Sequence, residues 1–196
     1  MDPNEVNIFY LHNDPKICAE MHNDKHCIKM ILEYAQLLST AHRVLDGTQS
    51  VGLSASGRKQ TRYVLPDVRE SILYSATHIN HPSAVWVRQS VGNYMWLTNL
   101  LQDLCKEYTY RYGKVHKCER DGLVQMLHDC IPDKIKSIAF TEPTPAMPDD
   151  VRVSGDSIMS YRNYYIKHKQ HLASWKGKVN SRIIPEWFNA SLQIQR

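Results

Sequence analysis

Three side chains that can bind phosphate or transfer protons lie on one predicted helix. His26, Lys29 and Glu33 are spaced by three and four residues, which places them on one face of an α-helix. Imidazole and carboxylate groups are common general acids and bases, and an ammonium group binds phosphate. The pattern predicts catalytic roles for Glu33 and His26 and ligand binding by His22, Lys25 and Lys29. It also fits a solvated helix face on which Lys29 and Glu33 form an ordinary ion pair.

A second polar group precedes a predicted helix that begins at Pro82. His78, Asn80 and His81 lie where the free N–H groups and the dipole of that helix attract anions, and Arg88 follows within the helix. These four side chains are candidate contacts to phosphate or to the edge of a nucleobase. The alternative is that Asn80 or His81 only caps the helix.

Tyrosines alternate with cations in two further segments, 106–117 and 161–169. Aromatic rings stack on nucleobases while neighbouring cations contact phosphates, so Arg111, Tyr161 and Arg162 are candidate ligand contacts. Such clusters also occur where half-buried tyrosines and basic residues complete the C-terminal end of a helix. Two of them in one small domain favour a nucleotide-type ligand.

The sequence lacks the signatures of several other chemistries. It has no GxSxG, Walker phosphate loop, GxGxxG or HExxH motif. The cysteines are odd in number and none has CxxC spacing; they are Cys18, Cys27, Cys105, Cys118 and Cys130. This pattern favours free cysteines in a reducing compartment. We therefore predict no metal site and no cofactor.

The composition is that of a mildly basic globular protein. The chain has 196 residues, 42% of them apolar, and a formal net charge of +4. This length suits one domain with a real core, whereas a non-specific DNA coat usually carries a denser basic stripe. No run of about 18 apolar residues is present, so we expect no membrane span. The segment MDPNEVNIFY lacks the features of a secretory signal, and we expect a cytoplasmic protein.

Helices must position these candidate residues. Capping residues, helical periodicity and glycine stops predict helices over residues 15–21, 24–43, 68–74, 82–112, 119–130 and 156–172. Residues 7–11 are expected to form a strand or an extended segment. The proline-rich segment 141–148 must be extended, because each proline biases its predecessor away from the helix.

The predicted fold class is mostly α, with little or no sheet. We expect a single compact helical domain over residues 1–196, with one long central helix at about 82–112. A tail, residues 173–196, packs on the core or trails from it. The small, polar and glycine-rich segment 47–61 predicts either a mobile surface loop or a flexible lid that brings cations onto a ligand.

Several strings of the sequence resemble a family of small, uncharacterised proteins of tailed phages that infect aquatic bacteria. They are NIFYLHNDP, DKHCIKMILE, THINHP and EYTYRYGK, and they occur in the family's order over nearly the whole chain. This resemblance implies a phage protein that acts in the cytoplasm of the infected bacterial host.

The sequence is also remotely similar to phage pyrimidine-dimer DNA glycosylases, which are compact helical proteins. Asp24-Lys25-His26, followed by Glu33, matches their Asp-x-His and their catalytic Glu seven residues beyond the His. That similarity implies base flipping and a carboxylate that stabilises a sugar cation. Those enzymes attack with a free N-terminal amine, whereas here six residues precede the equivalent start at Asn7. Lys29 could supply the amine instead only if it were buried.

Three functional hypotheses follow. The first is an enzyme that acts on DNA or a nucleotide through Glu33 and His26, with cationic support from Lys29 and Arg88. The second is a counter-defence pocket protein that sequesters or cleaves a small nucleotide immune signal of the cyclic or ADP-ribose type. The third is a non-enzymatic interaction module. The partner expected in the first two is a phosphate-bearing nucleic acid or nucleotide, and the sequence leaves the oligomeric state open.

Overall fold

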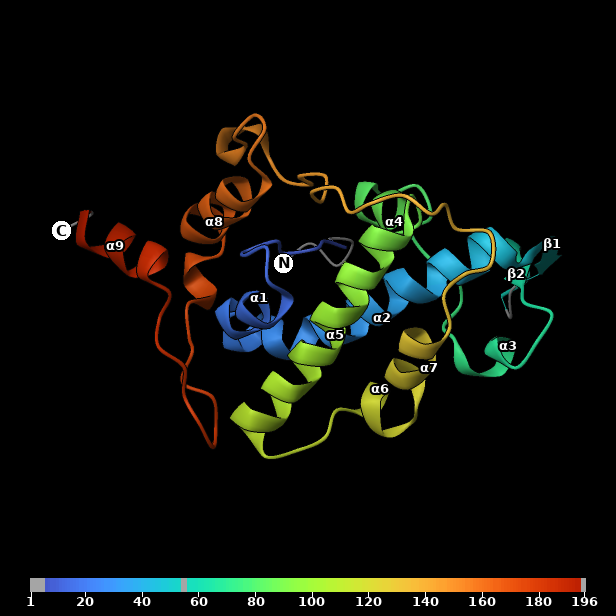
Figure 1. Ribbon diagram of the computed structural model, residues 1–196, viewed down its shortest axis with the longest axis horizontal. Coiled ribbons are helices and arrows are strands. Elements are labelled where there is room, and N and C mark those ends of the chain that lie inside the picture. The colour runs from blue at the N-terminus through green and yellow to red at the C-terminus, as the bar shows by residue number, and fades with distance from the viewer. Residues whose placement is uncertain (1–5, 54–55, 195–196) are drawn as a thin grey trace.

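The protein is mostly helical, as predicted. The computed structural model describes residues 6–53 and 56–194, and Figure 1 shows their arrangement. The elements follow in the order α1 (Pro15–Met21), α2 (Asp24–Asp46), β1 (Thr48–Leu53), β2 (Lys59–Val64), α3 (Arg69–Ile72), α4 (Pro82–Val87), α5 (Val91–Tyr112), α6 (Lys117–Arg120), α7 (Leu123–Asp129), η1 (Asp149–Val151), α8 (Ser157–His168), η2 (Gln170–Leu172) and α9 (Glu186–Ile194). Among these residues, no helix is long and apolar enough to cross a membrane.

Helices α2 and α5 form the centre of the molecule and cross each other (Figure 1). Asn23 caps α2 by accepting the N–H of His26, and Ser90 caps α5 by accepting the N–H of Asn93. Both helices bury long apolar stripes, and α1, α4 and α7 pack around them. The extended chain 6–11 is buried against this core without joining a sheet.

The long central helix is present as α5, but it begins at Val91 rather than at Pro82. Residues 82–87 form a separate short helix, α4, and Ser90 adopts an extended conformation between the two. The chain 136–140 packs against this junction, where Val91 donates to the carbonyl of Lys136 at 2.9 Å. Tertiary pairing at the junction therefore breaks a helix that periodicity alone would continue.

The prediction that segment 47–61 is a loop or lid is wrong about its secondary structure, because the segment contributes to two β-strands. Strands β1 and β2 pair antiparallel from Thr48 opposite Val64 to Leu53 opposite Lys59. We call the described residues of this hairpin, 48–53 and 56–64, the arm; residues 54–55 of the predicted loop lie outside the described residues. Its side chains are exposed in both strands except at Gly52 and Tyr63, which are half-buried. The arm stands at one end of the molecule, beyond the C-terminal end of α2 (Figure 1).

Two other helix boundaries differ from the prediction, and the tail takes one of its two predicted arrangements. The helix expected over 119–130 is two short helices, α6 and α7, separated by Gly122 at φ +81°. The helix expected to end near 172 ends at His168 and continues as the short 3₁₀ turn η2. The tail contains α9 and packs on the core through Trp175 and Phe188, both buried.

Candidate functional site

His26 lies in the core rather than on an open face. Its ring stacks on Phe9 at 4.1 Å between centroids, and Nδ1 lies 2.6 Å from the hydroxyl of Tyr165. The side chain is 2% exposed, and burial holds its pKa well below the usual value. His26 is therefore neutral in the folded protein, and its position favours a packing role.

His22 is also part of a buried network. Nδ1 donates to the carbonyl of Cys18 at 2.7 Å, so Nε2 accepts from the hydroxyl of Tyr34 at 2.8 Å. That hydroxyl in turn accepts the N–H of Phe9 at 3.2 Å. Burial lowers the pKa of His22 to about 4. The structure thus surrounds this predicted ligand contact with protein groups.

Lys29 and Glu33 form the ion pair that the helical spacing permits. Nζ and Oε1 are 2.8 Å apart, and the side chains are 38% and 11% exposed. Lys25 is exposed one turn earlier. The predicted stripe therefore divides: both histidines point into the core, while the lysines lie at the surface. The catalytic assignment of Glu33 and His26 stays a prediction, and the burial of His26 weighs against it.

Arg111 is completely buried and has protein partners for its guanidinium group. It pairs with Glu107 at 2.6 Å and Asp24 at 3.1 Å, and it donates to the carbonyls of His22 and Glu20. These bonds tie the C-terminal end of α5 to α1 and to the start of α2. The arrangement fits the structural alternative for this tyrosine-rich segment.

The second tyrosine-rich segment also serves packing. The Tyr161 hydroxyl donates to Oδ1 of Asn7 at 2.7 Å, and burial raises the pKa of Tyr161. Arg162 donates to the carbonyl of Leu11 at 3.0 Å, and its guanidinium lies 5.4 Å from the ring centre of Trp187. These contacts hold α8 against the N-terminal chain and α9.

Of the polar residues before α4, one caps the helix and two are exposed. His81 caps α4 by accepting the N–H of Ser83 at 3.2 Å, which matches one of the two predicted alternatives. Asn80 and His78 are exposed. His78 has a left-handed backbone, φ +49°, and its Nδ1 lies 2.8 Å from the hydroxyl of Thr77.

Arg88 lies in a different environment, at the edge of a hollow of about 230 Å³. Three cations line it, namely Arg88, Lys134 and Lys136, together with Leu45, Val85 and Gln89. We call this hollow the basic recess. None of its lining residues is acidic, and among the described residues none of the three cations has an ion pair.

The base of the arm lies near the basic recess, because β1 begins at Thr48, three residues after Leu45, which lines the recess. Burial lowers the pKa of Arg88. The arm adds the cations Arg58, Lys59 and Arg62, and residues 48–64 include no acidic side chain. Arg88, a predicted ligand contact, thus lies near the base of the segment predicted as either a surface loop or a lid. Lys134 and Lys136 were not predicted, although their Lys-x-Lys spacing was a signal.

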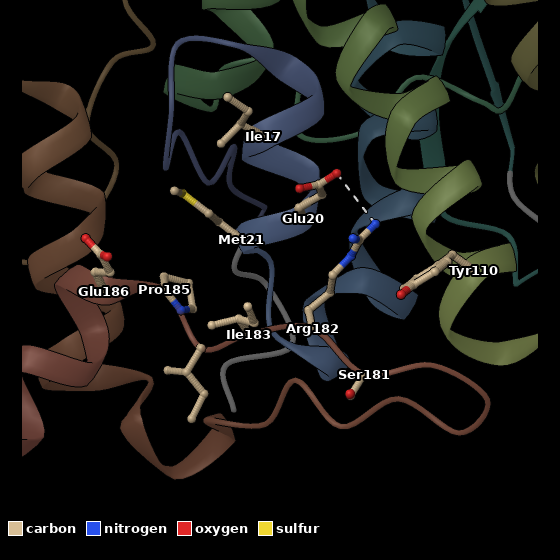
Figure 2. A pocket seen from close by; sticks show the side chains of 10 residues that line it. Ile17, Glu20, Met21, Tyr110, Ser181, Arg182, Ile183, Pro185 and Glu186 are labelled. Atoms are coloured by element: carbon tan, nitrogen blue, oxygen red, sulfur yellow. Dashed lines mark ion pairs between the residues drawn. The ribbon is translucent and has the colours of Figure 1, made fainter.

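In two other hollows the arginine is already paired with carboxylates of the protein. Figure 2 shows a larger one, about 450 Å³, where Arg182 points toward Glu20 and lies near Tyr110. Arg182 pairs with Glu107 at 2.8 Å and Glu20 at 3.5 Å and stacks 4.1 Å from the Tyr110 ring centre.

A third hollow, beside β2, contains Arg43. This guanidinium pairs with Glu70 and donates to the carbonyls of Tyr63, Glu70, Leu73 and Tyr74. The arm and the basic recess are therefore the candidate site for an anion.

Comparison with family models, with curated proteins and with solved structures finds no match for this chain. The resemblances to a phage family and to pyrimidine-dimer glycosylases therefore stay predictions. Within the part of the chain that the structure describes, no group of three or more His, Cys, Asp or Glu side chains is arranged to hold a metal ion.

Proposed function

We propose that this protein binds duplex DNA through its arm. The observation that carries the proposal is a two-stranded ribbon, exposed on both faces, with three cations and no carboxylate. A lone hairpin gains little from packing when its side chains face water. Its composition instead suits a surface that contacts a polyanion.

The two faces of the arm differ in chemistry. Residues opposite each other in an antiparallel pair share a face, so Ser50 lies with Arg62 and Gly52 with Gln60. Arginine and glutamine are residue types that read the edges of guanine and adenine, and serine bonds to either base. Because Gly52 has no side chain, nothing protrudes from this face at that position. On the opposite face of the arm, Val51 lies opposite Thr61 and Leu53 lies opposite Lys59.

The dimensions of the duplex favour B-form DNA as the partner. Its major groove admits a two-stranded β-ribbon, whereas the major groove of A-form RNA is too deep and narrow for side chains to read. The carboxylates near the base of the arm have cationic partners in the protein. Asp46, Asp67 and Asp133 share Arg69, and Glu70 pairs with Arg43.

The proposal is tested by fluorescence anisotropy with labelled duplexes of varied sequence. We expect Arg62→Gln to weaken binding and to change the preferred sequence, by about 1–3 kcal/mol at the base pair that Arg62 reads. Lys59→Gln, on the other face, should weaken binding about equally for all sequences. Lys178→Gln is the matched control, because Lys178 is exposed in the segment between η2 and α9, away from the arm (Figure 1).

Several results would overturn the proposal. Equal affinity of Lys59→Gln, Arg62→Gln and Lys178→Gln for duplex DNA would show that the arm is not the binding surface. A wild-type protein that binds only a cyclic or ADP-ribose-type nucleotide would favour the pocket hypothesis instead. Absence of binding to either ligand class would favour an interaction module.

A further inference from the structure

The basic recess concentrates positive charge that the protein itself does not neutralise. Lys134 and Lys136 approach Arg88 from a different segment of the chain, and no carboxylate lines the hollow. Three like charges around one small volume repel one another, which costs free energy in the absence of an anion. A bound anion removes that cost, so the recess suits a ligand with more than one negative charge.

Arg88 adds a second, independent observation. Its Nη1 is enclosed by protein and has no hydrogen-bond partner among the described residues. Burial without a partner disfavours a charged group, and the lowered pKa of Arg88 reflects this desolvation. An anion in the recess would compensate the desolvated guanidinium through its charge, although it would not bond to the enclosed Nη1, because electrostatic attraction is stronger where water is partly excluded.

The recess is built on fixed backbone rather than on mobile side chains alone. The carboxylate of Asp46 accepts the N–H groups of Asp133 and Lys134, at 2.9 and 3.1 Å. The carbonyl of Lys136 accepts from Val91 at the start of α5. Both lysines are thus anchored at their backbone beside the end of α4, where Arg88 directly follows the last helical residue, Val87.

We propose that the basic recess binds the terminal phosphate of a DNA strand, an inference that rests on the proposed DNA binding. Three cations match the three terminal oxygens of a phosphomonoester, which carries a charge of about −1.5 to −2 at pH 7. An internal phosphodiester offers two free oxygens and one charge, and it brings a nucleoside on each side. A phosphate at the end of a strand has a nucleoside on only one side, which suits a hollow of about 230 Å³.

The first test uses the full chain and a small probe that does not need the arm. Binding of a 5′-phosphorylated thymidine dinucleotide is compared by calorimetry with that of the same dinucleotide lacking the phosphate. We expect the phosphate to raise affinity at least about tenfold, the gain from one charge-assisted hydrogen bond. Arg88→Gln should remove this difference. Arg88→Lys, which keeps the charge, should retain part of it and shows whether a loss reflects charge or misfolding.

A second test separates the recess from the arm. Duplexes with and without terminal phosphates should differ in affinity for the wild-type protein and for Arg62→Gln, but not for Arg88→Gln. Equal affinity of the phosphorylated and unphosphorylated dinucleotides would overturn the recess proposal even if duplex DNA binds. Conversely, a phosphate-dependent dinucleotide affinity without duplex binding would sustain the recess as a phosphate site and overturn the DNA-binding proposal.

Discussion

At the scale of single residues, His42 lies among groups that fix its neutral form. The hydroxyl of Tyr94 donates to backbone carbonyls, so Nε2 of His42 donates to that hydroxyl at 2.8 Å. Arg69 donates to Nδ1 at 3.1 Å. A protonated His42 would direct an N–H group at the Arg69 guanidinium. Burial and the charge of Arg69 lower the pKa of His42 to about 4.

We therefore predict that stability falls as the pH falls from about 6.5 toward 4. Burial also lowers the pKa of His22 to about 4. Below the ordinary histidine pKa the unfolded chain binds protons that the folded protein does not, which costs about 1.4 kcal/mol per proton and pH unit. Urea unfolding at pH 7 and pH 5 measures the difference. His42→Gln should flatten this pH dependence.

Glu33 provides a second test at this scale. Because its pair with Lys29 is an i,i+4 ion pair reaching the surface, we expect Glu33→Gln to lower stability by only about 0.5–1 kcal/mol. Affinity for duplex DNA should be unchanged, which anisotropy measures. The same variant tests the glycosylase-like hypothesis: cleavage of a damaged duplex by the wild type that disappears in Glu33→Gln, with binding intact, would establish catalysis.

Residue type and spacing predicted contacts between residues close in sequence better than they predicted which side chains are buried. The Lys29–Glu33 pair and the cap at His81 follow from local sequence, and both are present. The burial of His26 and Arg111 does not follow from it, because their partners, Tyr165 and the carbonyl of Glu20, are distant in sequence. Of the predicted ligand contacts, Arg88 is the one that the structure places in the basic recess.

At the scale of elements, helix ends with strong local signals were predictable. Asp14 caps α1 ahead of Pro15, Asn23 caps α2, and Gly113 ends α5 in a left-handed conformation. The arm was not predicted, since its strands bury almost no side chains and lack the alternation of apolar and polar residues that marks a half-buried strand. The break before α5 depends on chain packing that only the folded molecule provides.

Gly92 tests that packing directly. A Cβ at this position would lie 2.2 Å from the backbone nitrogen of Phe140 and 2.6 Å from the carbonyl carbon of Ala139. We expect Gly92→Ala to destabilise the protein by about 1–3 kcal/mol, because backbone must move to accommodate it. Chemical unfolding measures the change. Faster hydrogen exchange of the amide at position 92, which in the wild type donates to the carbonyl of Ile138, would locate the change.

A matched variant gives the control for Gly92→Ala. A Cβ at Gly52 would meet no atom within 4 Å, and its backbone is not left-handed. Gly52→Ala should therefore change stability by less than about 0.5 kcal/mol. If both alanine variants were equally stable, the close approach of 139–140 to α5 would not be what ends α4 and positions Lys136.

At the scale of the whole molecule, the small net charge conceals an uneven distribution. The chain carries +4 overall, yet many acidic groups, among them Asp24, Glu107 and Asp46, are paired inside the body. The arm carries Arg58, Lys59 and Arg62, and the basic recess is lined by Arg88, Lys134 and Lys136. This distribution has a consequence for the salt dependence of binding.

Because Arg62 is assigned to a base edge and the recess to one terminal phosphate, the proposals place three phosphates on the protein, at Arg58, at Lys59 and in the recess. The expected slope of log K for duplex DNA against log salt is about −3, a loss of about 60-fold between 50 and 200 mM. Anisotropy titrations at four salt concentrations measure it. Lys59→Gln should reduce the slope by about one, and Lys178→Gln should leave it unchanged. A slope near −1 in the wild type would mean that a single phosphate is bound, which contradicts the arm as a DNA-binding surface and leaves only the recess.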